Sequence, residues 1–259
     1  MFPGRIPRKA PLWGALLFAL ALPAQALECP PDRIDRRARV AHVFDGDTVR
    51  LADGTPVRFI GINTPEHGRD GAPDEPFAAA ATAALRELLA AHGQRLALRL
   101  GAQRRDRHDR LLAHAYLPDG RSISRILLEH GLALHITVPP DTWNHRCYAA
   151  AERAARAGGR GLWEHPRYRG VAAAALPPDA AGFRVVEGRV RRVGESGRAW
   201  WLELDGLTLR LAKADLAYFE GTDPRDLLDV RIRVRGWIYR VRGEARMNLR
   251  HPDALEHLS

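Results

Sequence analysis

Residues 37–62 read RARVAHVFDGDTVRLADGTPVRFIGI, and this stretch decides the fold. Apolar and polar side chains alternate along it, as they do in half-buried β-strands. The alternation is broken at Asp45-Gly46-Asp47 and at Asp53-Gly54, where acidic residues and glycines favour tight turns. The stretch therefore predicts three strands in succession, beginning at Arg37, over 48–51 and over 57–62.

Downstream of this stretch, helix and strand signals alternate. Pro76 and Gly93 frame an alanine-rich helix over 76–91, because proline is tolerated in a first helical turn and glycine ends helices. The next elements are two strands and two helices, expected over 96–100, 111–117, 122–130 and 141–157. Asp141 is the expected N-cap of the last helix. Five strands with interleaved helices predict a mainly β fold with α-helices (α+β), an OB-type five-stranded Greek-key barrel with three helices.

A change in composition separates this first unit, residues 27–170, from a second one. Residues 171–182 are rich in Ala and Pro and poor in charge, which is typical of a linker. The block 183–259 has further strand patterns, expected over 185–193, 199–205, 207–212 and 230–241. We therefore expect a second small OB-like β-barrel at the C-terminus.

The first 26 residues have the features of an export signal. Three cations precede an uncharged apolar run over 12–22, and Ala24-Gln25-Ala26 supplies a small-x-small cleavage site. The run is too short for a spanning helix, which needs about 20 apolar residues, although an uncleaved anchor is the alternative. We expect residues 1–26 to be a signal peptide and the mature protein to be periplasmic or secreted, without stable membrane insertion.

Composition narrows the class of partner. The chain of 259 residues has a formal net charge of +9, and 46% of its residues are hydrophobic, which excludes wholesale disorder and fibrous repeats. Almost all of the positive charge is arginine, since Lys9 and Lys213 are the only lysines. A basic chain prefers polyanionic partners, chiefly nucleic acid or an anionic membrane surface.

Two cysteines lie in the expected mature chain. In an oxidising compartment Cys29 and Cys147 are expected to form a disulfide bond. Closing so long a loop stabilises a fold by about 4 to 5 kcal/mol in the chain-entropy model. Metal binding is the weaker interpretation, because no C-x-x-C or paired histidine spacing accompanies the cysteines.

Three short segments carry residues suited to chemistry. The turn DGDTV at 45–49 presents two carboxylates, hard oxygen ligands that suit Ca²⁺ or Mg²⁺, although on its own it is more often an ordinary Asp-Gly turn. In Thr64-Pro65-Glu66 the proline restrains the threonine to an extended conformation, which can turn its carbonyl toward a metal. Arg58 lies on the preceding strand, and Arg110 begins a strand after the charged turn DRHDR at 106–110.

Over residues 37–163 these segments, in this order, resemble the staphylococcal nuclease (thermonuclease) family. The similar segments are DGDTV at 45–49, VRFIGINTPE at 57–66, DRHDR at 106–110, LPDGRSISRILLEHGLA at 117–133 and AERAARAGGRGLW at 151–163. The resemblance implies an OB-fold nuclease, an endonuclease-type phosphodiester hydrolase of little sequence specificity that cleaves DNA and RNA with one bound Ca²⁺.

The resemblance also implies a metal site. Asp47 corresponds to the direct metal carboxylate, Asp45 lies nearby through water, and Thr64 gives its backbone carbonyl. The family has a second metal carboxylate directly before Thr-Pro-Glu, where this chain has Asn63. An amide still offers a carbonyl oxygen but removes one negative charge, so we expect weaker Ca²⁺ binding, and Mg²⁺ or another divalent ion remains an alternative.

The catalytic roles follow in the same way. Glu66 corresponds to the residue that positions and deprotonates the attacking water, and Arg58 and Arg110 to the phosphate clamp. We expect both arginines to point from the rim of the barrel into solvent. The tyrosine of the family's D-x-Y-G-R turn is replaced here by His108 and Asp109, which puts nucleotide stacking in doubt but not the clamp.

The second unit allows two interpretations. Arg231, Arg233 and Arg235 form a stripe that Trp237 and Tyr239 continue, and a basic groove with aromatic side chains holds single strands in OB-type barrels. The alternative is a folded appendage with a solvated arginine face. For the whole chain, the alternative to an enzyme is a catalytically weak nucleic-acid-binding or envelope-interaction module that retains the nuclease fold, or a scaffold for the C-terminal unit. The retained Glu66 favours the interpretation as an enzyme.

Overall fold

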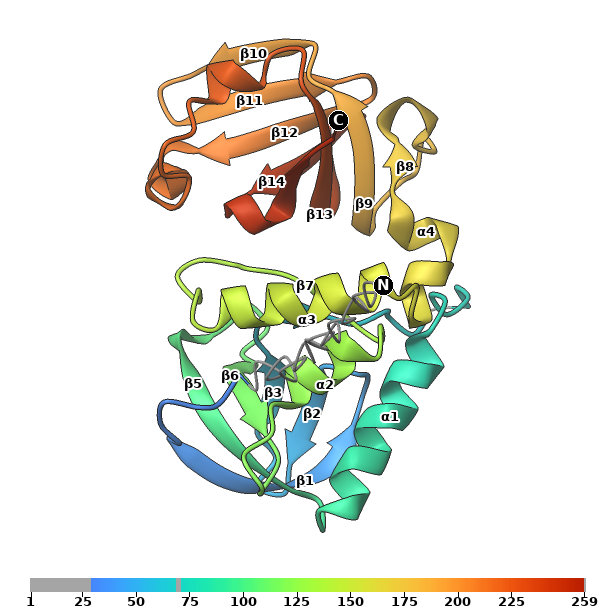
Figure 1. Cartoon of the computed structure of the whole chain (residues 1–259), viewed down its shortest axis with the longest axis vertical. Coiled ribbons are helices and arrows are strands. Elements are labelled where there is room, and N and C mark those ends of the chain that lie inside the picture. Colours follow the sequence, from blue (N-terminus) through green and yellow to red (C-terminus); the bar gives the residue numbers. More distant parts are fainter. Residues whose placement is uncertain (1–28, 69–70, 259) are drawn as a thin grey trace, which may run out of the picture.

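The computed structural model describes residues 29–68 and 71–258, so the expected signal peptide, residues 1–26, lies outside the described residues. Figure 1 shows two bodies stacked along the long axis, a barrel with helices below and a curled sheet above. Within the described ranges, no helix is both long and apolar enough to cross a membrane.

The N-terminal body is a closed barrel with the strand order β1-β2-β3-β6-β5, which confirms the predicted OB-type fold. Its strands are β1 (Arg36–Val43), β2 (Thr48–Leu51), β3 (Pro56–Phe59), β5 (Arg95–Arg105) and β6 (Leu111–Tyr116). All neighbours are antiparallel except β3 and β6, which pair in parallel and close the barrel. The interior is apolar, with Val49, Val57 and Leu98 fully buried.

The third predicted strand, 57–62, is divided in the structure. Gly61 has a φ of +87°, and a Cβ there would lie 2.5 Å from the ring of Tyr148, so only glycine allows this close approach. Beyond it, β4 (Ile62–Asn63) leaves the barrel and pairs with β7 (Leu134–His135). The division turns the segment after Gly61 toward the turn between β1 and β2.

The helices cover the barrel close to where they were expected. They are α1 (Ala78–Ala91), α2 (Ile123–Glu129) and α3 (His145–Ala157), followed by the 3-10 helix η1 (Gly161–Glu164) and the short α4 (Pro166–Arg169). The predicted N-cap of α3 is wrong, because the helix begins four residues after Asp141. The carboxylate of Asp141 instead accepts a hydrogen bond from the backbone N–H of Ala102, at 2.5 Å. A long-range contact with β5 has replaced the local cap.

The predicted disulfide bond between Cys29 and Cys147 is present. Both cysteines are buried, at 1% and 6% exposure, and they belong to the core of the barrel body. The bond therefore joins the segment that precedes β1 to the first turn of α3.

The C-terminal body is an eight-stranded curled sheet with the order β10-β11-β12-β14-β13-β9-β8, with β15 paired to β13. Its strands are β8 (Val171–Ala172), β9 (Gly182–Arg189), β10 (Arg192–Glu195), β11 (Ala199–Leu204), β12 (Leu207–Ala212), β13 (Arg231–Val241), β14 (Glu244–Leu249) and β15 (Leu255–His257). Short 3-10 helices lie among them, including η3 (Lys213–Tyr218), η4 (Pro224–Leu227) and η5 (Pro252–Ala254). The sheet is barrel-like, as expected.

The segment expected to be a linker is packed onto this sheet. β8 pairs in parallel with β9, and η2 (Ala173–Ala175) follows it. Ala173 and Ala180 are both 3% exposed and belong to the apolar core of the C-terminal body. Residues 171–182 thus contribute to the second core, because small apolar side chains can pack closely as well as form a flexible connection.

The two bodies share an apolar cluster where they meet. Leu134, Leu162 and Trp163 of the barrel body pack together with Phe183 and Val185 of β9. In Figure 1 the helix α3 lies along this boundary, beneath the edge of the curled sheet formed by β13, β14 and β9. We call this boundary the seam.

Candidate active site

The turn between β1 and β2 places two acidic side chains, Asp45 and Asp47, against the segment that follows β4. A backbone N–H of Asp47 donates to Oδ1 of Asp45 at 2.9 Å, which fixes the turn. A Cβ on Gly46 would lie 2.7 Å from Cγ2 of Thr64, so glycine lets the turn pack directly against the segment after β4. Asp45 is 9% exposed and Asp47 is 1% exposed.

The carboxylate of Asp47 is the centre of the site. Its Oδ2 lies 2.5 Å from Nη1 of Arg58 and accepts a hydrogen bond of 2.7 Å from the backbone N–H of Thr64. Burial raises the pKa of Asp47 to about 6; the Arg58 guanidinium opposes this rise and the neighbouring Asp45 adds to it. The site thus holds more negative charge than one arginine neutralises.

Arg58 extends from β3 into this cluster. Its Nη2 donates to Oδ1 of Asn63 at 3.0 Å, and its side chain is only 11% exposed. The expectation that Arg58 points from a rim into solvent is therefore wrong, since the buried carboxylate of Asp47 holds the guanidinium inward. The amide oxygen of Asn63, which the resemblance assigns to a metal, thus also accepts a hydrogen bond from Arg58.

Thr64 and Glu66 follow on an extended segment. Oγ1 of Thr64 is buried and has no hydrogen-bond partner within the described part of the chain. Glu66 is exposed, and its backbone is fixed on both sides by Glu75: its N–H donates to Oε2 of Glu75 at 3.2 Å, and its carbonyl accepts from the N–H of Glu75 at 2.9 Å. Glu75 in turn pairs with Arg167 of α4. These contacts position the loop that carries Glu66.

Arg110 lies at the start of β6 and is held by Asp106. The guanidinium Nε donates to Oδ2 of Asp106 at 2.8 Å, and although burial opposes it, the hydrogen bonds from Arg110 keep the pKa of that carboxyl below its usual value. Arg58 pairs with Leu112 across β3 and β6, and Arg110 directly precedes β6, two positions before Leu112. The side chain of Arg110 is 30% exposed.

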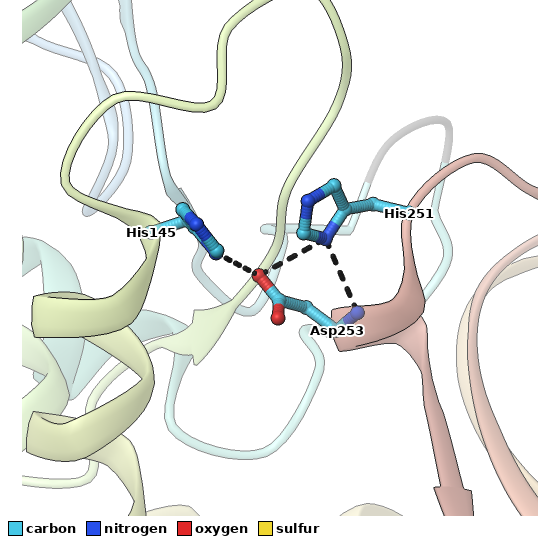
Figure 2. A group of neighbouring side chains, drawn as sticks. All are labelled: His145, His251 and Asp253. Atoms are coloured by element: carbon cyan, nitrogen blue, oxygen red, sulfur yellow. Dashed lines mark hydrogen bonds and ion pairs between the residues drawn. The ribbon is translucent and has the colours of Figure 1, made fainter. Parts of the chain in front are cut away.

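The structure also assembles a cluster that sequence reasoning missed. His145, at the start of α3, lies next to two residues of the C-terminal body, His251 and Asp253 (Figure 2). His251 directly precedes η5, and Asp253 belongs to it. His145 and Asp253 are 108 positions apart in the chain, and their side chains are 2.9 Å apart. No local sequence pattern predicts such a group, apart from the spacing of His251 and Asp253.

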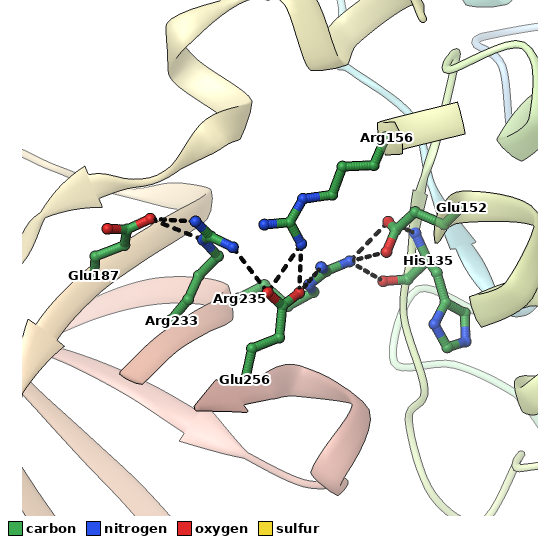
Figure 3. A network of polar contacts seen from close by, with 7 residues as sticks. All are labelled: His135, Glu152, Arg156, Glu187, Arg233, Arg235 and Glu256. Atoms are coloured by element: carbon green, nitrogen blue, oxygen red, sulfur yellow. Dashed lines mark hydrogen bonds and ion pairs between the residues drawn. The ribbon is translucent and has the colours of Figure 1, made fainter. Parts of the chain in front are cut away.

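The predicted basic stripe of the second unit is used at the seam. Nη1 of Arg235 lies 2.7 and 2.6 Å from the two carboxylate oxygens of Glu152 on α3, and Nη2 donates to Oε1 of Glu256 at 2.9 Å (Figure 3). Arg233 reaches Glu187 and Glu256, each within 2.8 Å. These two arginines therefore bind carboxylates and do not form an open groove. Burial alone would lower the pKa of Arg235, but Glu152 and Glu256 raise it.

Comparisons with known proteins place the barrel body in a family. Residues 56–165 match the family model described as "Staphylococcal nuclease homologue". The chain is 31% identical to the succinoglycan biosynthesis protein ExoI of Rhizobium meliloti (strain 1021) over 156 residues, which are 59% of this chain and 71% of that protein.

This chain is also 30% identical to a thermonuclease of Staphylococcus intermedius. The match covers 128 residues, which are 48% of this chain and 74% of the relative. An uncharacterized endonuclease of Escherichia coli O157:H7 is 26% identical over 138 residues, 50% of this chain and 78% of that protein. The family model includes Arg58, Glu66 and Arg110 and ends before the C-terminal body. The chain therefore belongs to the staphylococcal nuclease homologue family and is a nuclease of that family.

Proposed function

We propose that this protein is a secreted or periplasmic, Ca²⁺-dependent phosphodiesterase that hydrolyses DNA, RNA or both with little sequence specificity. The observation that carries the proposal is the buried cluster around Asp47, in which Arg58 pairs with Asp47 and a second almost buried carboxylate, Asp45, lies beside it. Arg58, Glu66 and Arg110 are the proposed catalytic residues, and Asp47, Asp45, Asn63 and Thr64 the proposed metal-binding residues.

The chemistry of the cluster fits a hard divalent cation. Asp45 and Asp47 are almost buried, and Arg58 neutralises only one of their two charges. Burying an uncompensated carboxylate is costly, and a cation removes that cost. Oγ1 of Thr64 is a further buried oxygen without a partner in the described residues. All of these donors are oxygens, which Ca²⁺ prefers. Asp47 would bind the ion directly, with Asp45 acting through water and Asn63 and Thr64 offering carbonyl oxygens.

A bound Ca²⁺ would supply positive charge that polarises the phosphoryl group and stabilises the negative charge that grows on it. The residues of the chain do the remaining work. Glu66 is exposed and lies two residues after Thr64, and in the proposed mechanism its carboxylate orients a water molecule and accepts its proton as the water attacks phosphorus. Arg58 and Arg110 donate hydrogen bonds to the phosphate oxygens where this charge develops.

Both guanidinium groups keep donors for this purpose. The described contacts of Arg58 use Nη1 and one hydrogen of Nη2, and a guanidinium has five N–H donors. Arg110 is held by one carboxylate through Nε and Nη2, which directs its fork without using every donor. Preorganised arginine forks suit phosphate better than lysine does, because they match two oxygens at once.

Two observations support a site of action outside the cytoplasm. The Cys29–Cys147 disulfide bond belongs to proteins of oxidising compartments. Residues 1–26 have the composition of a signal peptide. The nucleic acid outside the cytoplasm is not the cell's own genome. Cleavage with little sequence specificity agrees with that location.

A catalytically weak nucleic-acid-binding or envelope-interaction module is the second candidate. The contact between Arg58 and Asn63 favours it, because Asn63 lacks the charge of a carboxylate and its oxygen already accepts one hydrogen bond from a cation. A weakened metal site with intact arginines would bind phosphates without cutting them quickly.

One experiment separates the two candidates. The mature chain, residues 27–259, is incubated with single-stranded DNA, double-stranded DNA and RNA in Ca²⁺, in Mg²⁺ and in chelator. We expect cleavage in Ca²⁺, its loss in chelator, and its loss in Glu66→Gln while binding to the same substrate in chelator is kept. Binding without Ca²⁺-dependent cleavage of any substrate would support the second candidate and refute the first.

A further inference from the structure

His145, His251 and Asp253 gather from both bodies of the molecule. Nδ1 of His145 lies 2.9 Å from Oδ2 of Asp253, and Nδ1 of His251 lies 3.2 Å from the same oxygen. One ligand atom from each residue lies within 4.8 Å of the others. Figure 2 shows the two imidazole rings approaching the carboxylate from opposite sides, one from α3 and one from the loop before η5.

The hydrogen bonds leave a contact that a cation would resolve. The backbone N–H of Asp253 donates to Nδ1 of His251 at 3.2 Å, so this nitrogen presents a lone pair. The same nitrogen faces the anionic Oδ2 of Asp253 at 3.2 Å. Two acceptors, Nδ1 of His251 and Oδ2 of Asp253, thus lie close together. A metal ion between them would bind both, taking the nitrogen lone pair in place of the long hydrogen bond from the N–H.

The surrounding residues orient the carboxylate. Oγ1 of Thr137 donates to Oδ2 of Asp253 at 2.6 Å. Because the hydroxyl has one hydrogen, it accepts from Nε2 of His135, which lies 3.2 Å away and is 2% exposed. A hydrogen-bonded chain of this kind behind a ligand is what holds metal-binding carboxylates in position.

The donor set and spacing suit a transition metal. Imidazole nitrogen with one carboxylate suits Zn²⁺ and its first-row neighbours, whereas Ca²⁺ and Mg²⁺ take oxygen ligands. With bonds of 2.0–2.1 Å, the ligand atoms of a tetrahedral zinc site lie about 3.3 Å apart. The separations of 2.9 and 3.2 Å are already close to this value. A cavity of 150 Å³, lined in part by Thr137 and Asp253, borders the carboxylate side of the cluster and has room for a water molecule.

We propose that His145, His251 and Asp253 form a binding site for Zn²⁺ or a similar transition-metal ion at the seam, separate from the site at Asp47. Three protein ligands leave a fourth position for water from the cavity. Since His145 belongs to the barrel body and the other two ligands to the C-terminal body, the ion fixes one body on the other.

Metal binding by the full mature chain tests this proposal directly. The chain is stripped with chelator and titrated with ZnCl₂ in a calorimeter, and Co²⁺ is used as a spectroscopic probe. We expect one equivalent of Zn²⁺ to bind, and Co²⁺ to give the visible absorption of a tetrahedral site. His145→Gln and His251→Gln should weaken Zn²⁺ binding at least about 100-fold, and Thr137→Val, which removes only an orienting hydrogen bond, about 10- to 100-fold.

Matched controls separate this site from others. His42→Gln changes an exposed histidine on β1, and Asp47→Asn changes the proposed calcium site; both should bind Zn²⁺ like the unmodified chain. Zn²⁺ should also raise the melting temperature of the unmodified chain but not of His145→Gln, whose fold is checked by circular dichroism. The proposal is overturned if no stoichiometric Zn²⁺ binds, or if His145→Gln and His251→Gln bind it as well as His42→Gln does.

Discussion

Arg58 and Arg235 are both arginines with almost fully buried side chains, at 11% and 5% exposure. Arg58 lies among Asp47, Asp45 and the neutral Asn63, so the negative charge of its surroundings exceeds its own. Arg235 lies in a group of three guanidinium and three carboxylate groups, in which every charge has an opposite partner (Figure 3).

The difference shows how buried charge serves function or stability. At the seam the charges balance and each guanidinium is held by carboxylates, so the network joins two bodies and leaves nothing for a ligand. Around Asp47, burial raises the pKa of the carboxyl, Arg58 offsets this rise only in part, and the second carboxylate, Asp45, adds to it. A cation and a phosphate are the ligands that would restore the balance there.

The largest expected effect comes from removing the seam arginine. Arg235→Ala leaves Glu152 buried and unpaired, which should lower the free energy of unfolding by about 3 to 5 kcal/mol. Urea unfolding of the purified chain measures it. Arg231→Ala, an exposed position on the same strand, is the matched control and should change stability by less than about 0.5 kcal/mol. Equal stability of the two variants would mean that the network does not stabilise the fold.

The second prediction concerns the arginines of the nuclease site. Arg58→Lys and Arg110→Lys keep the charge but lose the fork, and each should lower kcat about 100-fold, the scale seen when one preorganised donor is removed. Stability should change little in either variant, in contrast with Arg235→Ala. Cleavage rates at saturating Ca²⁺, together with melting temperatures, give the comparison. Lysine variants that cut as fast as the unmodified chain would show that the clamp is assigned to the wrong residues.

A third prediction restores charge next to Arg58. Asn63→Asp adds an anionic oxygen to the cluster, and a net gain of about 1 to 2 kcal/mol in Ca²⁺ binding corresponds to roughly tenfold to thirtyfold. Half-maximal cleavage should shift to lower Ca²⁺ by that factor. Asn63→Gln, which adds no charge, is the control. An unchanged Ca²⁺ dependence would indicate that the new carboxylate pairs with Arg58 and does not bind the ion.

The last prediction concerns a buried group that carries no charge. Burial, aided by the nearby Arg99, lowers the pKa of His114 to about 3, whereas the unfolded value is near 6.5. Between these pH values the unfolded chain binds a proton that the folded chain does not, so stability falls as the pH falls through this window. The slope from this group is up to about 1.4 kcal/mol per pH unit.

Urea unfolding at pH 7, 5.5 and 4.5 measures that slope. His114→Gln should be less sensitive to pH than the unmodified chain by this amount, while the carboxylates contribute equally to both. Identical pH slopes would mean that His114 takes up its proton in the folded state.

Local patterns predicted the barrel well because its strands and turns are encoded by neighbouring residues. The strand 48–51 and the Asp45-Gly46-Asp47 turn needed only alternation and a glycine. β14 was missed because its sequence, EARMNL, contains no β-branched or aromatic residue, although it alternates in burial. The start of α3 was misplaced because the carboxylate of Asp141 binds the backbone of a distant strand.

The candidate site, too, was predicted where local sequence carries the information and missed where distant residues meet. The resemblance brought Asp45, Asp47, Asn63 and Thr64 together, and the structure does so as well. The hydrogen bond from Arg58 to Asn63 was not predicted, because the resemblance gave that oxygen to a metal. Alternation placed Arg235 on the outward face of a strand, but it cannot show what covers that face; its partner, Glu152, is 83 positions away.

The contacts of Glu75 link the proposed catalytic loop to the rest of the molecule. Glu75 fixes the backbone of Glu66, pairs with Arg167 of α4, and lies 3.7 Å from Arg184 of β9. The C-terminal body therefore contacts, through Arg184, the residue that fixes the backbone of Glu66. A chain cut after residue 170 would lose Arg184, expose the apolar surface that Phe183 covers, and hold Glu66 less firmly. A domain boundary drawn at residue 170 therefore cuts through the contacts that Glu75 and Phe183 make between the two bodies.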